Sequence, residues 1–310
     1  MRIREQIEKT NGINRRAPYY IQSVMNIIKS HIELGEWTEA QLLQEEVLKI
    51  IEGTHISAVE SVKNNLALTF WKQGRWKEAE ELLLQVIETL KRVLGQEHPS
   101  TLTSIDNLAS AYRNQGRWKR AEELEVQVTE TFKRVLGQEH PDTLTSMSNL
   151  ASTYRNQGRW KEAEELFVQV METRKRVLGQ EHPDTLTSMA NLASTYQKQG
   201  RWKETEELEV QVMETRKRVL GQDHPDALTG MANLASTYRD QERWIEAEEL
   251  EVQVIETLKR VLGQEHPDTL TCMASLRHFG IRADGRRPKS WERRSWRQER
   301  RYSAKSIQTP

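Results

Sequence analysis

The sequence contains a single cysteine, Cys272, among 310 residues. One thiol excludes a disulfide framework and a zinc site of the C-x-x-C type. No apolar run approaches the roughly 18 residues of a membrane-spanning helix. The first residues, MRIREQIEKT, are charged and lack the apolar stretch of a signal peptide. We therefore expect a cytoplasmic protein with no membrane association.

Apolar residues and catalytic motifs are also scarce. Apolar residues make up 36% of the chain and charged residues 30%, which is lean for a globular domain. This composition argues against one thick core and leaves disorder or a thin, repetitive architecture. The sequence has no G-x-x-x-x-G-K-[ST] phosphate loop and no G-x-S-x-G nucleophile elbow. We expect a protein that is not an enzyme.

The overall charge balance hides two different regions. The chain carries 46 Lys and Arg and 46 Asp and Glu. Residues 277–310 hold eleven of the basic residues and only three of the acidic ones. Residues 1–276 therefore have an acidic excess, with 35 basic and 43 acidic residues. The two regions need separate explanations.

A repeat with a fixed period of 42 residues dominates the first region. The string G-Q-E-H-P or a variant begins at Gly95, Gly137, Gly179, Gly221 and Gly263. Residues 137–178 and 179–220 are identical at 37 of 42 positions. Weaker units precede these, with their turns near Gly74 and Gly35. Self-similarity at such a period is the signature of a repeat architecture.

Each unit predicts an antiparallel pair of helices. His182-Pro183 opens the first helix, since proline suits a first helical turn. Apolar residues from Leu186 to Tyr196 then follow helical spacing. A break at Gly200 precedes a second helix from Trp202 to Leu220, which Gly221 ends. The apolar positions of that second helix are Leu208, Val210, Val212, Met213 and Val219. Such a pair buries its apolar stripe only by stacking on its neighbours.

Two aromatic residue types recur once in each unit. We predict that the tryptophans form the core between helices; they are Trp76, Trp118, Trp160, Trp202 and Trp244. The loop histidines are His98, His140, His182, His224 and His266. One histidine per helix pair places them on the order of 10 Å apart, whereas zinc needs ligands about 2 Å from one ion. We assign the histidines a structural role and expect no metal and no cofactor.

The repeats resemble a known family. Leu150-Ala151, Tyr154, Gly158, Trp160, Ala163 and Phe167 fall on the tetratricopeptide repeat pattern, with Met147 in place of its leading tryptophan. The strings N-L-A-x-x-Y-x-x-Q-G-R-W-x-E-A-E and L-G-Q-E-H-P-D resemble the kinesin-light-chain class of these repeats over residues 19–276. The resemblance implies an all-α, right-handed superhelical solenoid of about six helix pairs. Glu242 and Thr205 depart from the pattern, at the turn glycine and the close-packing alanine.

The resemblance also implies that the first helix of each pair lines a concave groove. The predicted groove residues are Asn65, Leu68, Trp71, Asn107, Ser110, Arg113, Asn149, Ser152, Arg155, Asn191, Ser194, Gln197, Asn233, Ser236 and Arg239. Asparagine amides both donate and accept hydrogen bonds, so a row of them could hold an extended peptide backbone. Arginines beside them would favour acidic side chains. The alternative is that these residues are merely solvated.

Two comparisons between units bear on the groove. Three of the five differences between 137–178 and 179–220 fall on its predicted positions, which are Ser148/Ala190, Arg155/Gln197 and Asn156/Lys198. This is the pattern of a copied scaffold with a varied binding surface. Leu68 and Trp71 replace the Ser and Arg of other units. Trp71 could anchor a partner, but we favour packing against the N-terminal helix around Tyr19 to Ile32.

These features predict a non-catalytic protein-interaction scaffold that binds an extended peptide or a partner helix, with acidic partners favoured. Two alternatives remain open. Close relatives commonly follow a nucleotide-binding switch domain, so the chain could be the ligand-sensing repeat region of a larger NB-ARC/STAND-type signalling protein. It could also be a kinesin-light-chain-like cargo adaptor, although no heptad coiled coil precedes the repeats.

The basic tail at residues 277–310 breaks the repeat pattern. It is charge-rich and has no helical periodicity, so we expect disorder there, and residues 1–18 are expected to be poorly ordered. A basic segment with tryptophans suggests a nucleic-acid arm. However, a shifted reading of possible codons for residues 278–291 permits F-W-N-Q-G-R-W-K-E-A-E-E-L. We interpret the tail as an out-of-frame translation of a further repeat, without specific nucleic-acid recognition.

Overall fold

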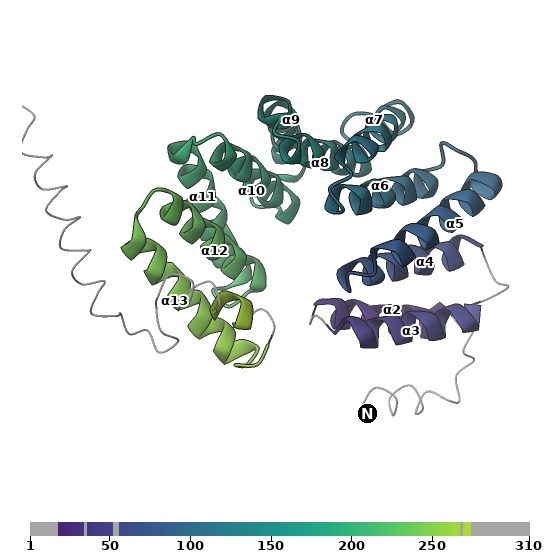
Figure 1. The fold of residues 1–310 in the computed structure, drawn as a ribbon, viewed down its shortest axis with the longest axis horizontal. Coiled ribbons are helices and arrows are strands. Elements are labelled where there is room, and N and C mark those ends of the chain that lie inside the picture. Colours follow the sequence, from purple (N-terminus) through teal and green to yellow (C-terminus); the bar gives the residue numbers. More distant parts are fainter. Residues whose placement is uncertain (1–17, 34–35, 52–55, 267–268, 274–310) are drawn as a thin grey trace, which may run out of the picture. The chain divides into compact units, whose positions relative to one another are not determined.

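The computed structural model describes residues 18–33, 36–51, 56–266 and 269–273. In these ranges the regular structure is entirely helical (Figure 1). In chain order the helices are α2 (Pro18–Glu33), α3 (Trp37–Ile51), α4 (Ile56–Lys72), α5 (Trp76–Leu94), α6 (Pro99–Asn114), α7 (Trp118–Val135), α8 (Pro141–Asn156), α9 (Trp160–Leu178), α10 (Pro183–Lys198), α11 (Trp202–Leu220), α12 (Pro225–Asp240) and α13 (Trp244–Val261). The predictions for residues 1–17 and 277–310 lie outside the described residues.

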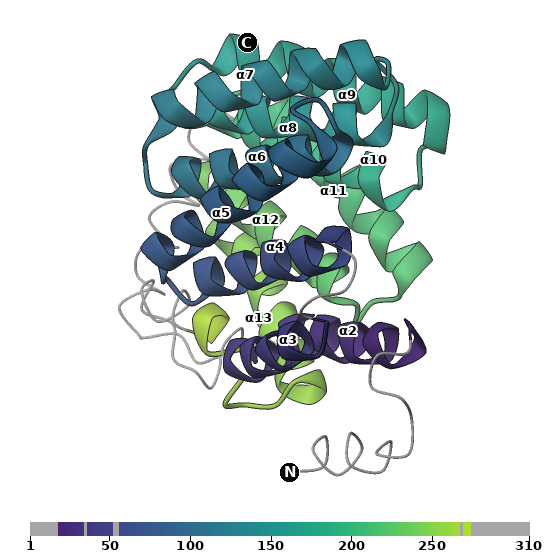
Figure 2. The same cartoon turned by 90° about the vertical axis from the view of Figure 1, so that its right-hand side faces the viewer.

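The chain forms two compact units, Met1–Leu178 and Gly179–Pro310, which we describe separately. The first unit holds α2 to α9, and each of these helices packs on the next one along the chain (Figures 1 and 2). Within it α4 also contacts α6, and α6 contacts α8. In the second unit α10 to α13 pack consecutively in the same way. The predicted all-α fold of successive helix pairs is confirmed, with six such pairs in the described residues.

The boundaries of the helices follow from capping residues and turns. The Nδ1 atom of His98 accepts a hydrogen bond from the backbone N–H of Ser100 at 3.2 Å, one residue past the proline that begins α6. His140, His182 and His224 cap α8, α10 and α12 in the same manner. These four histidines therefore satisfy N–H groups that would otherwise lack partners at the helix starts. Their structural role is thus visible in the hydrogen bonds.

The turn inside each pair needs a residue with positive φ. Glycine supplies it at Gly74, Gly116, Gly158 and Gly200, with φ between 74° and 79°. In the last pair Glu242 adopts φ 61° at the same position, a conformation that is uncommon for residues other than glycine. The hydrogen bonds of the turn are kept, since the Arg243 N–H still donates to the Tyr238 carbonyl at 2.8 Å. The departure at Glu242 leaves the turn geometry unchanged.

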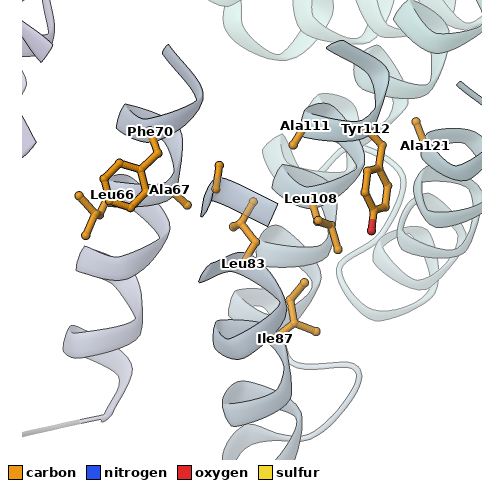
Figure 3. Close-up of a cluster of buried hydrophobic side chains, with 10 residues drawn as sticks. Leu66, Ala67, Phe70, Leu83, Ile87, Leu108, Ala111, Tyr112 and Ala121 are labelled. Carbon is orange, nitrogen blue, oxygen red and sulfur yellow. The ribbon is translucent and has the colours of Figure 1, made fainter. Parts of the chain in front are cut away.

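The apolar core lies between neighbouring helices and neighbouring pairs. Figure 3 shows one cluster, in which Leu66, Ala67 and Phe70 of α4 lie near Leu83 and Ile87 of α5. Leu108, Ala111 and Tyr112 of α6 and Ala121 of α7 belong to the same cluster. Because this cluster combines residues of two successive pairs, these pairs depend on each other for burial, as expected for a repeat architecture.

The second departure, Thr205, is accommodated in the core. It is fully buried at the position where Ala79, Ala121 and Ala163 are also fully buried. Its hydroxyl donates a hydrogen bond to the Arg201 carbonyl at 2.9 Å, one helical turn earlier. A polar atom placed in a close-packed position is thereby satisfied.

The prediction that the tryptophans form the core between helices was wrong. Trp76, Trp118 and Trp160 are each about 40% exposed, and Trp202 and Trp244 are half-buried. Each stands at the first position of a second helix, on the outer side of the turn. At Gly74 an added Cβ would lie 3.4 Å from the Trp76 indole nitrogen, so the ring covers the turn glycine. The prediction for Val219 was also wrong, because this side chain is 47% exposed.

Candidate functional site

The predicted groove residues lie on one face of the first helices, which we call the first-helix face. In the first unit it comprises Asn65, Leu68, Trp71, Asn107, Ser110, Arg113, Asn149, Ser152 and Arg155 on α4, α6 and α8. The contacts of α6 with both α4 and α8 bring these three sets together. In the second unit the face comprises Asn191, Ser194 and Gln197 on α10 and Asn233, Ser236 and Arg239 on α12. There α10 and α12 both pack on α11.

The asparagines and serines of this face border on solvent. Asn233 is exposed, and the other asparagines and all four serines are half-buried. Asn149 is nevertheless engaged within the protein, because its Nδ2 donates to Asp106 Oδ2 at 2.6 Å. Its amide is therefore oriented toward α6. The row of asparagines is thus not a set of equivalent binding groups.

Arg113 is held inside the protein. Its Nη1 lies 2.9 Å from Glu125 Oε1 and also donates to the Asn149 carbonyl at 2.9 Å. Its Nη2 donates to the Ser110 hydroxyl at 3.2 Å. Glu125 comes from the middle of α7 and has no exposed surface. The guanidinium therefore joins the first-helix face to a carboxylate in the core beneath it.

The other helix pairs have two residues at the same positions as Arg113 and Glu125, but the residue types vary. The residue twelve positions after the arginine position lies on the second helix, and we call it the core partner. The couples are Trp71 with Leu83, Arg113 with Glu125, Arg155 with Phe167, Gln197 with Glu209 and Arg239 with Glu251. Arg239 pairs with Glu251 at 2.7 Å. Arg155 lies over the Phe167 ring, with 5.6 Å from its Cζ to the ring centroid. Arginine therefore lies over a carboxylate in two couples and over an aromatic ring in a third.

Burial shifts the pKa values of these groups. It raises the pKa of Glu125 to about 7, against the opposing effect of Arg113. Burial also raises the pKa of Glu209 to about 7. The residue paired with Glu209 in its couple is Gln197, which carries no positive charge. The pKa of Asp106 rises to about 6 through burial, although the bond from Asn149 opposes this. The pKa of Arg155 is lowered by burial and, to a smaller extent, by repulsion from Arg113.

Leu68 and Trp71 behave differently from each other. Leu68 is 38% exposed. Trp71 is half-buried against the cluster of α4 to α7 and meets Trp76 edge-on, with 6.3 Å between ring centroids. Lys72 lies 4.9 Å from the Trp71 ring centroid. Trp71 therefore packs inward, on the cluster of α4 to α7. Leu68 is the more accessible apolar group of the two.

The carboxylates beneath the face were not predicted from the sequence. Glu125 and Glu209 are buried and Glu251 is half-buried, although charged residues are seldom buried unless they are paired. Alignment of the units contained the signal, since glutamate at this position stands where two other units have an apolar residue, Leu83 or Phe167. Asp106 gave no such periodic signal.

The described residues show no feature of a metal site or a membrane span. No three His, Cys, Asp or Glu side chains within them gather closely enough to hold a metal ion. None of the helices in the described part of the chain combines the length and the apolar character needed to cross a bilayer. The first-helix face offers amides, hydroxyls and guanidinium groups, which are suited to hydrogen bonding with another chain.

A comparison with protein-family models identifies the repeats. The model described as tetratricopeptide repeat matches residues 58–134, 126–176, 142–218 and 189–260. No curated protein matches the chain.

Solved structures give the same result. A Podosopora anserina protein described as a kinesin light chain with nearly identical TPR-like repeats is 36% identical over 67% of this chain and 98% of its own, with a TM-score of 0.57. NprR in complex with its cognate peptide NprX is 16% identical over 91% of this chain and 80% of its own, with a TM-score of 0.60. A STAND protein with a tetratricopeptide repeat sensor from Pyrococcus horikoshii is 13% identical over 85% of this chain and 40% of its own, with a TM-score of 0.55. The last two likenesses concern the fold alone.

Proposed function

Because the chain belongs to the tetratricopeptide repeat family, we propose that it is a non-catalytic interaction module that binds an extended peptide of a partner protein along the first-helix face. The observation that carries this proposal is the composition of the face. Its asparagines and serines are short, uncharged and half-buried or exposed. Short polar side chains let another backbone approach closely and supply both donors and acceptors to it.

The second helices differ from this face in a way that supports the proposal. Their exposed sides carry long charged residues in ion pairs, such as Arg134 with Glu97 and Arg176 with Glu139. Long paired side chains keep a second backbone at a distance, and ordering them costs conformational entropy. The first-helix face is therefore the better platform for an extended chain. NprR, a solved structure of the same fold, is described as being in complex with its cognate peptide NprX.

The attraction for acidic peptides at this face is expected to be modest. Arg113 and Arg239 each face a core carboxylate, Glu125 and Glu251, at hydrogen-bonding distance. Part of their positive charge is therefore balanced within the protein. We propose that affinity comes mainly from hydrogen bonds to the peptide backbone, and specificity from contacts such as Leu68, which offers an apolar surface at the N-terminal end of the face.

A peptide-array screen with the full chain tests this function. Peptides selected on the array would be titrated in solution against Asn107→Ala and Ser152→Arg, which remove an amide from the face and block it with a bulky side chain. We expect the second change to weaken binding by roughly tenfold or more, about 1.4 kcal/mol. The control is Gln127→Ala, an exposed position on α7 outside the face. Binding that both face variants leave unchanged, or no bound peptide at all, would refute the proposal.

A further inference from the structure

A cavity of about 730 Å³ opens at the turns of two successive pairs in the first unit. It lies between the turn that joins α6 to α7 and the turn that joins α8 to α9. Its lining residues are Gly116, Arg117, Trp118, Lys119, Arg120, Glu122, Gln157 and Arg159. None of them belongs to the first-helix face, so the cavity is a separate surface.

Two arginines form fixed walls of this cavity. The Arg117 guanidinium stacks on the Tyr112 ring at 4.1 Å and pairs with Glu80 at 2.7 Å. Arg159 stacks on Tyr154 at 4.0 Å and pairs with Glu122 at 2.6 Å. Both guanidinium groups are therefore held in place, and each has a carboxylate that balances its charge.

The remaining cationic side chains, Lys119 and Arg120, are exposed at the cavity. Arg120 stands where every other long repeat has glutamate; these residues are Glu78, Glu162, Glu204 and Glu246. In each of those repeats the glutamate pairs with the arginine three residues earlier, as Glu246 does with Arg243 at 2.9 Å. Among the five long repeats, the one that contains α7 has instead Arg120 three residues after Arg117. Like charges at this spacing lie on one face of a helix and destabilise it. Such a local conflict is expected where function overrides stability.

Trp118 completes the site with an apolar surface. Its side chain is 41% exposed at the edge of the cavity. The hollow is open to solvent over much of its extent, which suits a chain lying across it more than an enclosed small ligand. The cavity is also a positive site on an acidic background, because residues 1–276 carry 43 acidic and 35 basic residues.

We propose that this cavity binds an acidic segment of a partner protein. Lys119 and Arg120 contact neighbouring carboxylates of the segment, and arginine suits this role because its planar fork can hold a carboxylate through two hydrogen bonds. The Trp118 ring packs against the aliphatic part of the bound glutamate side chains. The segment lies across two successive turns, with Arg117 and Arg159 as its rigid borders. The protein then has two separate binding surfaces, one lined mainly by amides and hydroxyls on the first helices and a basic one at the turns.

The test uses fluorescein-labelled hexaglutamate and the full chain, with binding followed by fluorescence anisotropy at about 50 mM salt, where surface charges are weakly screened. We expect saturable binding, no binding of hexaglutamine, and a roughly tenfold loss of affinity in Arg120→Glu. This variant restores the residue of the other repeats and is expected to fold, which circular dichroism and the Tm verify. Equal binding by wild type and Arg120→Glu would overturn the proposal.

A charge-matched variant separates a specific site from general attraction. Arg120→Glu combined with Glu246→Arg keeps the net charge of the chain but moves the positive residue to the second unit. We expect this double variant to bind hexaglutamate as weakly as Arg120→Glu alone. Recovery of wild-type affinity would show that only net charge matters and would reject the site. Asn107→Ala on the first-helix face should leave hexaglutamate binding unchanged, so that failure of one proposal is distinguishable from failure of the other.

Discussion

The helix pairs α8/α9 and α10/α11 have nearly identical sequences but different core residues. Residues 137–178 and 179–220 differ at five positions. In the first copy the core partner is Phe167, fully buried beneath Arg155. In the second copy it is Glu209, 6% exposed, and Gln197 stands at the arginine position. Two of the five differences therefore fall on the two positions of one couple, one on the first-helix face and one in the core.

Between these two copies the residue on the face and its core partner both change. An arginine accepts either an aromatic ring or a carboxylate below it, as Phe167 and Glu125 show. Gln197 instead donates to Asp240 at 2.7 Å and leaves Glu209 without a cationic residue in its couple. Because a buried charge is costly unless it is paired, the second copy should be sensitive to pH in a way that the first is not.

The largest expected effect comes from emptying the core of the first copy. Phe167→Ala removes a fully buried ring and should lower the free energy of unfolding by about 3–5 kcal/mol, the usual cost of Phe to Ala in a core. Urea denaturation followed by circular dichroism measures this loss. Phe167→Leu, which installs the residue found at Leu83, is the matched control and should cost about 1 kcal/mol. Similar losses for both variants would contradict the assignment of Phe167 as a tightly packed core residue.

A second prediction concerns the buried ion pair of α6 and α7. Arg113→Ala leaves Glu125 buried without its partner and should cost about 2–3 kcal/mol, less than the roughly 3–5 typical of a broken buried pair, because Glu125 can bind a proton. Arg113→Trp combined with Glu125→Leu copies the apolar couple of Trp71 and Leu83. This double variant should be more stable than Arg113→Ala in the same denaturation experiment. If it is less stable, the two positions do not act as a couple.

The third prediction is the pH dependence of the second copy. The pKa of Glu209 is raised from 4.5 to about 7 by burial, opposed by Thr237 and reinforced by Asp240 and Glu206. The folded state therefore holds the proton more tightly than the unfolded state. The resulting stability is complete below about pH 4.5 and is lost as the pH rises through about 7. Across this window the loss should reach about 2–3 kcal/mol, since one pKa unit corresponds to about 1.4 kcal/mol.

The measurement is the difference in unfolding free energy between the wild type and Glu209→Gln at several pH values from about 5 to about 8. Asp106 and Glu125 titrate in both proteins, so the difference isolates Glu209. Glu209→Phe combined with Gln197→Arg rebuilds the couple of the first copy and should flatten the profile to the same extent. A wild-type profile parallel to that of Glu209→Gln would show that burial does not perturb this carboxyl.

The boundaries of the helices could be predicted because their causes are local and recur every 42 residues. Proline after a capping histidine starts α10, and a glycine with positive φ follows each of α10 and α11, so these helices begin and end within one residue of the expected positions. The family and the fold class were predicted for the same reason. The buried Thr205 also followed from its place in the repeat, since it occupies an alanine position.

The interior of the site could not be predicted in this way. Whether a glutamate on the second helix is exposed depends on its angle around the helix and on the neighbouring pair. Glu125 is fully buried, whereas Glu123, two residues earlier, is exposed. The prediction that the tryptophans are buried was wrong for the opposite reason. Hydrophobicity predicted burial, but their position at the turn leaves much of Trp118 in solvent. In both cases the exposure of the side chain is determined by residues that are neighbours in the folded structure and not in the sequence.

The smallest expected effect concerns the turn that distinguishes the last pair from the others. Glu242 adopts φ 61° where Gly158 adopts φ 79°. Glu242→Gly relieves a left-handed conformation that costs an ordinary residue about 1–2 kcal/mol. Part of that gain is lost because glycine also increases the entropy of the unfolded chain. The net stabilisation should be about 0.5 kcal/mol, visible as a small rise in Tm.

The reverse substitution at the equivalent turn of another pair provides the control. Gly158→Glu introduces the same strain into α8/α9, and an added Cβ at Gly158 meets nothing within 4 Å, so no steric clash contributes. Its cost should therefore match the gain from Glu242→Gly in size and oppose it in sign. A destabilising Glu242→Gly would mean that the Glu242 side chain makes a stabilising contribution that outweighs the backbone strain. The two turns would then differ in more than their φ angle, and the repeats could not be treated as interchangeable there.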